Sequence, residues 1–211
     1  MGFLGIRRKL NPEKYFSISS NAKELYYTQF FDIVDLSKLV REPSTNYSDF
    51  ALTPLTIQFL NVPFTTTPRQ LVKLLGKPQY VKAYQPSSSC EFRIYFYKKR
   101  FFKNKVIVQF YFVNEIFAYC IVTFLTLNAA DEKKLVGMLN SKYLDPREPS
   151  LNVTSIRDKN GYYVYYENAF YSSLVYINNS LTVKEALSHD ERQIIHLKKW
   201  QKHYDEWKDS L

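Results

Sequence analysis

Residues 65–125 read TTTPRQLVKLLGKPQYVKAYQPSSSCEFRIYFYKKRFFKNKVIVQFYFVNEIFAYCIVTFL, and the rest of the chain is organised around this stretch. It opens with the signals of a short helix. Thr67 can accept a hydrogen bond as the N-cap, and Pro68 suits the first helical position, where no backbone N–H is needed. Gly76 favours a left-handed residue at the helix end, and a proline two residues later prevents its continuation. The sequence therefore predicts a helix over 68–75.

After this helix the hydrophobic period changes to two, which is typical of strands. Apolar residues alternate with others over 92–97, 106–112 and 116–124, and Asn114-Glu115 between the last two runs favours a tight hairpin. Phe and aliphatic side chains are expected on the face toward the core. The opposite face is then rich in tyrosine, which makes it a candidate binding surface, represented by Tyr95, Tyr97 and Tyr111.

A second unit of helix and strands is predicted after residue 128. Asp131-Glu132 suits a helix N-terminus, and Leu135-Val136-x-Met138-Leu139 repeats Leu71-Val72-x-Leu74-Leu75. Strands are expected over 153–157, 162–166 and 174–177, with an Asn160-Gly161 turn between the first two. We therefore predict an α+β fold in which two tandem helix-plus-antiparallel-strand units share a curved sheet, with helices over 68–75 and 131–140 on its apolar face.

The predicted organisation is one globular body with four segments. Residues 1–50 form an N-terminal arm with an irregular or helical segment, 51–128 the first unit, 129–180 the second unit and 181–211 a long C-terminal helix. The helix is predicted from an apolar stripe with helical steps. This stripe consists of Leu187, Ile194, Leu197, Trp200, Tyr204 and Trp207.

The helix that ends in LLGKP, followed by three meandering strands, resembles the modules of the β-lactamase-inhibitor-protein fold. It is also similar to the small BamE-type outer-membrane assembly lipoproteins. The resemblance rests on 71–78 and on the strand pattern after it, within 65–125, and a fainter echo occurs in the second unit. It implies a protein that binds with its sheet rather than an enzyme. We expect no signal peptide and no lipidated cysteine near the start, so the periplasmic role of these relatives is not implied.

Composition argues against several classes of site. The chain has 211 residues, 45% of them hydrophobic, and its 18 Tyr and 16 Phe favour sheets. Only 5 Gly are present and no glycine-rich phosphate loop is found. Cys90 and Cys120 lie on separate predicted strands and form no CxxC motif; we predict that they are reduced and dispensable, with a disulfide as the alternative. No catalytic constellation and no cofactor site is predicted.

The three histidines do not predict a metal site. His189, His196 and His203 stand seven residues apart, which on one helix separates neighbours by about 10 Å. Imidazole nitrogens must lie about 2 Å from a metal, so this trio cannot chelate one ion. No metal ligands are therefore predicted.

The protein is expected to be soluble and cytoplasmic. The apolar residues before Arg7-Arg8-Lys9 are too few for a signal-peptide core, and the basic residues follow them rather than precede them. The longest apolar run, 116–127, is too short to span a bilayer. We predict no transmembrane segment.

The net charge of +9 is concentrated in places. A predicted hairpin tip carries five basic residues around Phe101-Phe102, namely Lys98, Lys99, Arg100, Lys103 and Lys105. Such a cluster can be a solvated loop that maintains solubility, or it can bind an anionic partner. We expect a non-enzymatic protein-interaction module that binds another protein with an acidic surface, through its sheet face or this hairpin. The alternative is binding of nucleic acid or of an anionic membrane by the hairpin.

Overall fold

The structure is a computed structural model that describes residues 22–24, 26–27, 50–87, 90–145, 153–168 and 171–188, without the side chains at 84, 86, 87, 90, 187 and 188. The chain divides into two compact units, Met1–Asp32 and Ile33–Leu211. The described residues of the first unit are helical, and the rings of Tyr26 and Tyr27 meet edge to face with centroids 5.0 Å apart. The second unit contains all the described strands.

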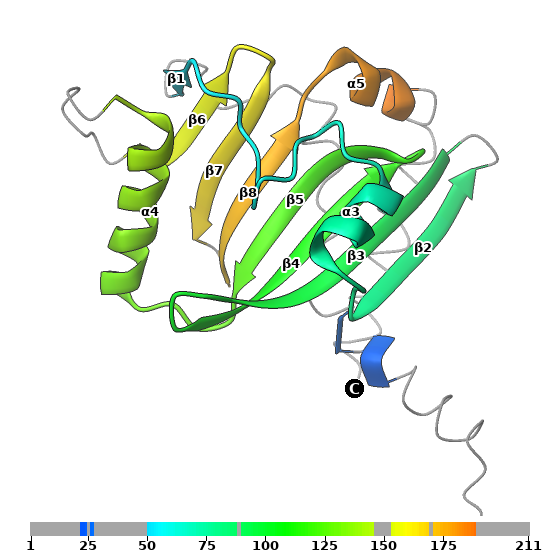
Figure 1. Ribbon diagram of the computed structural model, residues 1–211, viewed down its shortest axis with the longest axis horizontal. Coiled ribbons are helices and arrows are strands. Elements are labelled where there is room, and N and C mark those ends of the chain that lie inside the picture. Colours follow the sequence, from blue (N-terminus) through cyan, green and yellow to red (C-terminus); the bar gives the residue numbers. More distant parts are fainter. Residues whose placement is uncertain are drawn as a thin grey trace, which may run out of the picture. The chain divides into compact units, whose positions relative to one another are not determined.

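The second unit is built on one eight-stranded sheet of described residues (Figure 1). In chain order its strands are β1 (Ala51–Thr53), β2 (Tyr80–Ser87), β3 (Cys90–Phe101), β4 (Asn104–Val113), β5 (Ile116–Phe124), β6 (Ser155–Asp158), β7 (Tyr162–Asn168) and β8 (Ser172–Asn178). Their order across the sheet is β1-β6-β7-β8-β5-β4-β3-β2. The sheet is mixed because β1 and β6 are parallel, whereas the other neighbouring strands are antiparallel.

This architecture shows that the predicted α+β fold of two tandem helix-plus-strand units is wrong. One mixed sheet dominates the described residues, and its helices are the short α3 (Pro68–Leu75), α4 (Ala129–Tyr143) and α5 (Leu181–Ser188). β1, which was assigned to the first unit, pairs with β6 of the second. The two predicted units are therefore joined by strand pairing into one sheet, and they do not form a tandem repeat.

The long C-terminal helix is the other corrected element. Its described part is the eight-residue α5, and positions 189–211 lie outside the described residues. The three histidines and most of the predicted apolar stripe belong to those positions. The prediction of a helix over the whole of 181–211 is therefore replaced by α5.

The local helix signals of the sequence are confirmed at α3. The Gln70 backbone N–H donates to Thr67 Oγ1 at 3.3 Å, and the Thr67 backbone N–H donates to Gln70 Oε1 at 2.8 Å. This reciprocal pair is a capping box. Gly76 ends the helix with φ 82°, in the region that favours glycine. The boundaries 68–75 were predicted correctly because all of these determinants are local.

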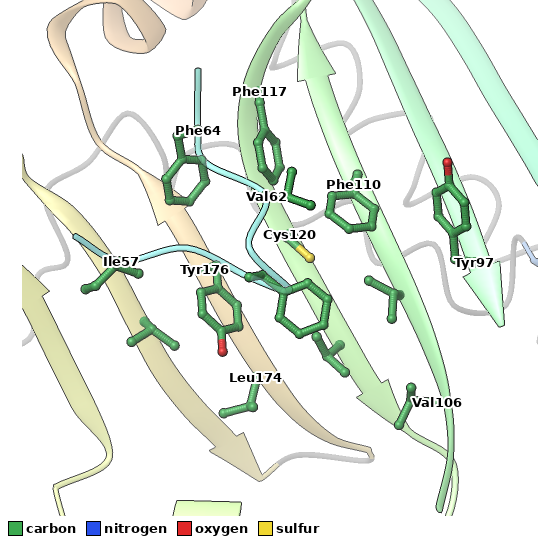
Figure 2. Close-up of a cluster of buried hydrophobic side chains, with 14 of the residues drawn as sticks. Ile57, Val62, Phe64, Tyr97, Val106, Phe110, Phe117, Cys120, Leu174 and Tyr176 are labelled. Carbon is green, nitrogen blue, oxygen red and sulfur yellow. The ribbon is translucent and has the colours of Figure 1, made fainter. Parts of the chain in front are cut away.

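The core lies between one face of the sheet and a layer formed by the coil 54–67, α3 and α4. Figure 2 shows the coil side chains Ile57, Val62 and Phe64 over the residues of the central strands. The Phe64 ring lies 4.8 Å from Phe117 of β5, centroid to centroid. Burying such rings supplies most of the stabilisation of this layer, about 1.5–3 kcal/mol for each fully buried large side chain.

The pairing of β3 with β4 shows that the side chains of β3 were predicted on the wrong faces of the sheet. Tyr95 lies opposite Phe110 and Tyr97 lies opposite Val108, so both tyrosines belong to the core face. The opposite face of β3 carries a second row of side chains, which is buried as well: Phe92, Ile94 and Phe96. The two-residue turn Phe102-Lys103 sets this register. A tyrosine-rich exposed face was therefore predicted wrongly, because a strand buried on both faces gives no alternation between inside and outside.

Candidate functional site

The predicted hairpin tip is confirmed as a tight hairpin at one end of the β3–β4 pair (Figure 1). We call residues 98–105 the basic tip. Phe101 pairs with Asn104, so the turn itself is Phe102-Lys103. The exposed cations of the tip are Lys98, Arg100, Lys103 and Lys105, and Lys99 is half-buried. All five basic residues that the sequence singled out therefore lie within one short projection.

The charges of the basic tip lie on both sides of the hairpin. Alternation along β3 puts Lys98 and Arg100 on one face and Lys99 on the other. Lys99 Nζ lies 5.7 Å from the centroid of the Tyr97 ring, on the core face. Lys105 lies opposite Arg100, and Lys103 is in the turn. Three of the five cations, Lys98, Arg100 and Lys105, therefore share one face, while Lys99 lies on the other face and Lys103 in the turn.

Arg100 and Lys105 form a cross-strand pair of like charge, which is destabilising. Among the described residues, no carboxylate forms an ion pair with Arg100, Lys103 or Lys105. Arg93 on the same strand is different, because its guanidinium lies 2.7 Å from Glu91 and 2.8 Å from Glu115. Within the described part of the chain, the hairpin therefore has ion-paired charge at the Arg93 end and, at the tip, three cations without a carboxylate partner: Arg100, Lys103 and Lys105.

We expect Arg100→Glu to raise the free energy of unfolding by about 0.2–1 kcal/mol, because it converts the repulsive pair with Lys105 into an attractive one. Urea unfolding followed by circular dichroism measures this change. The double variant Arg100→Glu/Lys105→Glu restores like charges and should lose the gain. A double variant as stable as the single one would show that the pair does not interact.

The basic tip carries two adjacent aromatic side chains, Phe101 at the end of β3 and Phe102 in the turn. Phe101 meets Phe124 of β5 edge to face at 6.1 Å, which ties the tip to the core. Phe102 meets Phe101 edge to face at 5.4 Å and is 49% exposed. Its φ is 54°, where glycine or asparagine is the usual residue of a two-residue hairpin turn. The turn of the tip therefore presents a half-exposed, bulky ring on an unfavourable backbone conformation.

α4 supports the base of the basic tip. Asn104 Nδ2 donates to Asp131 Oδ2 at 3.3 Å, and Asn128 Nδ2 donates to the same oxygen at 3.0 Å. Asn128 also caps α4, because its Oδ1 accepts from the Asp131 backbone N–H at 2.9 Å. The Leu125 backbone N–H donates to the Lys105 carbonyl at 3.4 Å. These contacts fix the direction in which the tip projects.

The three predicted tyrosines do not join the basic tip as a surface. Tyr95 and Tyr97 are buried in the core, and Tyr111 is buried on the other face of the sheet. The Tyr97 hydroxyl donates to the Gly76 carbonyl at 3.1 Å, and burial raises its pKa to about 12. Tyr111 stacks on Tyr119 with centroids 3.9 Å apart. All three side chains are buried and have contacts inside the fold, which for Tyr95 is the edge-to-face contact with Phe112.

The two cysteines are not placed to form a disulfide. Cys120 lies opposite Phe110, which lies opposite Tyr95, and Cys90 is five residues further along β3. Five residues of strand at about 3.3 Å and two strand spacings of about 4.8 Å separate them far beyond disulfide reach. Cys120 is a free, fully buried thiol, and burial raises its pKa well above the ordinary value. It is therefore an unreactive core residue, whereas the dispensability of both thiols stays a prediction.

A buried carboxylate that the sequence did not single out is Asp158. Its Oδ2 accepts from the Ile57 backbone N–H at 2.9 Å. Its Oδ1 accepts from the backbone N–H groups of Asn160 at 2.8 Å and Tyr162 at 3.0 Å. The signal was the Asp at the start of the DKNG turn, a typical position for an Asx turn. These three bonds make Asp158 a structural clamp between the coil 54–67 and the β6–β7 turn.

Within the described residues, no group of three or more His, Cys, Asp or Glu side chains could hold a metal ion. No helix in the part of the chain that the structure describes is long and apolar enough to cross a membrane. Comparison with protein-family models, curated proteins and solved structures gives no match to this chain. The candidate site is therefore interpreted from its own geometry.

Proposed function

We propose that this protein is a non-enzymatic interaction module that docks an anionic partner through its basic tip. The carrying observation is the Arg100–Lys105 cross-strand pair, which keeps like charges together without a described carboxylate to neutralise them. Such a pair costs stability in the free protein. A negatively charged partner would remove that cost and add attraction, so binding is the simplest reason for the arrangement.

Two further observations support this proposal. One favours the basic tip over the sheet face as the docking surface, and the other favours binding over catalysis as the function. Tyr95, Tyr97 and Tyr111 are buried, so the tyrosine rows offer no docking surface. The buried carboxylate of Asp158 accepts three backbone hydrogen bonds, and the thiol of Cys120 is enclosed in the core. These two groups, one a possible acid and one a possible nucleophile, are thus engaged in holding the fold.

An acidic protein surface, an anionic membrane and nucleic acid all present the required charge. Nucleic acid favours several aromatic side chains on which successive bases stack. The basic tip has one half-exposed ring, Phe102, while Phe101 is held against Phe124. Nucleic acid is therefore the least suited of the three partners.

The proposal predicts that reversing Arg100, Lys103 and Lys105 to Glu lowers affinity for an anionic probe by at least about a hundredfold, since each cation near an anionic surface adds about fivefold. The probes are polyglutamate, an oligothymidylate strand, and vesicles of phosphatidylserine in phosphatidylcholine. Binding is measured at low salt, where surface electrostatics is least screened. The wild type should bind at least one probe.

The matched control reverses Lys73, Lys77 and Lys159, which are exposed and lie outside the tip. It gives the same net charge, so it should reduce affinity far less than the tip variant. Equal losses in the two variants would show that only the overall charge matters. That result, or a wild type that binds none of the three probes, would overturn the proposal.

A further inference from the structure

Phe102 is unusual among the described non-glycine residues with positive φ. The others lie in the turns Leu60-Asn61 and Asn114-Glu115, and each of these turns contains an asparagine, which tolerates this conformation. The Phe102-Lys103 turn contains neither asparagine nor glycine. A bulky residue with positive φ is a backbone outlier that folding alone does not favour. Its presence therefore points to a role for the side chain outside the fold.

The Phe102 ring is held in a projecting position. It rests edge to face on Phe101, which rests on Phe124 of the core face. The hydrogen bond from Asn104 to Asp131 connects the other side of the turn to α4. An apolar ring that is 49% exposed thus lies in the turn of a hairpin that contacts both the core and α4.

The cations near this ring lie on both faces of the hairpin and in its turn. Lys99 is on the core face of the hairpin, Arg100 and Lys105 are on the opposite face, and Lys103 is beside Phe102 in the turn. A partner that touches one side of the hairpin would meet only some of them. A flat anionic surface that the tip enters end-on can contact the turn and both faces of the hairpin together. A bilayer also accepts a projecting side chain without a preformed pocket, and aromatic rings are favoured at its headgroup level.

We infer that the basic tip docks this protein on an anionic lipid bilayer. Phe102 inserts at the headgroup level, and the surrounding lysines and arginine contact lipid phosphates and carboxylates. This inference rests on the proposed function, which is docking of an anionic partner, and it identifies that partner as a membrane. One apolar side chain and a few cations give reversible, salt-dependent attachment, not permanent anchoring.

The test compares Phe102→Gly with Leu60→Gly. Leu60 is the matched control because it is also a large apolar residue in a turn, with φ 48° and 43% exposure. Glycine relieves the positive φ at either position, so both variants should melt no lower than the wild type. Binding is measured by cosedimentation with vesicles of phosphatidylcholine containing about one third phosphatidylserine. Phe102→Gly should lower the partition coefficient about tenfold, whereas Leu60→Gly should leave it unchanged.

Phe102→Trp gives a second, direct reading of insertion. The tryptophan should retain vesicle binding, and its emission should shift to shorter wavelength on adding vesicles by more than the wild-type emission does. Vesicles of phosphatidylcholine alone should produce no shift, because the cations find no net negative charge there.

The outcomes separate this inference from the proposed function. If Phe102→Gly binds vesicles as well as the wild type while the charge-reversed tip does not, the membrane insertion is wrong and the electrostatic docking stands. If the wild type binds polyglutamate or oligothymidylate but not vesicles, the partner is a protein or a nucleic acid and the inference is overturned. If the wild type binds none of these probes, both proposals fail.

Discussion

Raising the pH from about 9 to about 12 should unfold this protein, because burial opposes ionisation of side chains in its core. Burial raises the pKa of Cys120 well above 9.0 and the pKa of Tyr176 well above 10.0, and the neighbouring Tyr143 adds to the latter. The unfolded chain loses these protons at the ordinary pKa values, whereas the folded chain keeps them. Because the unfolded state then binds fewer protons, the free energy of unfolding falls as the pH rises. The contribution is fully present below about pH 9.

The expected size is large relative to ordinary stabilities. Each group that is ionised only in the unfolded state lowers the free energy of unfolding by about 1.4 kcal/mol per pH unit. At about pH 11, Cys120 and Tyr176 together remove about 4 kcal/mol from a typical total of about 5–15 kcal/mol. Tyr97, with its pKa at about 12, acts in the same direction. Urea unfolding at a series of pH values, together with tyrosinate absorbance, measures the decline.

Tyr176→Phe provides the control for this alkaline instability. The ring stays in the core, where it packs 5.2 Å from Phe59, but the ionisable hydroxyl is removed. Above about pH 10 the stability of this variant should fall less steeply than that of the wild type, by about 1.4 kcal/mol per pH unit. A wild type whose stability is constant up to about pH 11 would contradict the assignment of these groups to a closed core.

Local structure could be predicted from the sequence where neighbouring residues determine it. The capping residues and Gly76 of α3 lie within one short segment, and the predicted and observed boundaries agree. The Asn114-Glu115 turn was predicted from its asparagine, and both of its residues have positive φ. The basic tip was predicted because a run of alternating residues on each side leaves only a turn between them. In each case no distant partner is needed.

The fold class depended on a pairing that sequence periodicity does not encode. β1 has only three residues, and it pairs with β6 about a hundred positions later, Thr53 opposite Asp158. A period of two predicts a strand but carries no information about its neighbour. The predicted two-unit fold is wrong at this point, because it treated residues 51–128 and 129–180 as separate units. The pairing of β1 with β6 joins them in one sheet.

The faces of the central strands could not be predicted for a different reason. Tyr95 and Ile94 lie on opposite faces of β3 and are both buried. Periodicity distinguishes two faces but cannot identify an exposed one where neither is exposed. The exposure of the basic tip could be predicted, because a cluster of five cations is seldom buried. The charged half of the candidate site was therefore predictable, and the tyrosine half was not.

Replacing Asp158 with Ala should lower the free energy of unfolding by about 3–5 kcal/mol. The buried Ile57 backbone N–H loses its acceptor, which costs about 1–3 kcal/mol. The partly buried N–H groups of Asn160 and Tyr162 lose theirs as well, at about 0.5–1.5 kcal/mol each. Asp158→Asn keeps one acceptor oxygen, so its loss should be smaller than that of Ala. Urea unfolding at neutral pH measures both variants.

The control for this clamp is Glu115→Ala, which removes an exposed carboxylate from another turn of the same sheet. Its ion pair with Arg93 is worth at most about 1 kcal/mol, because exposed pairs are screened by solvent. The pairing registers put Asp158 at the end of the sheet away from the basic tip. At low temperature, where the Asp158→Ala variant is folded, it should therefore bind the same probes as the wild type. A loss for Asp158→Ala no larger than for Glu115→Ala would show that the coil 54–67 is held by its apolar contacts alone. A loss near the expected value would mean that one carboxylate fixes this coil over the sheet, and with it the layer that closes the core.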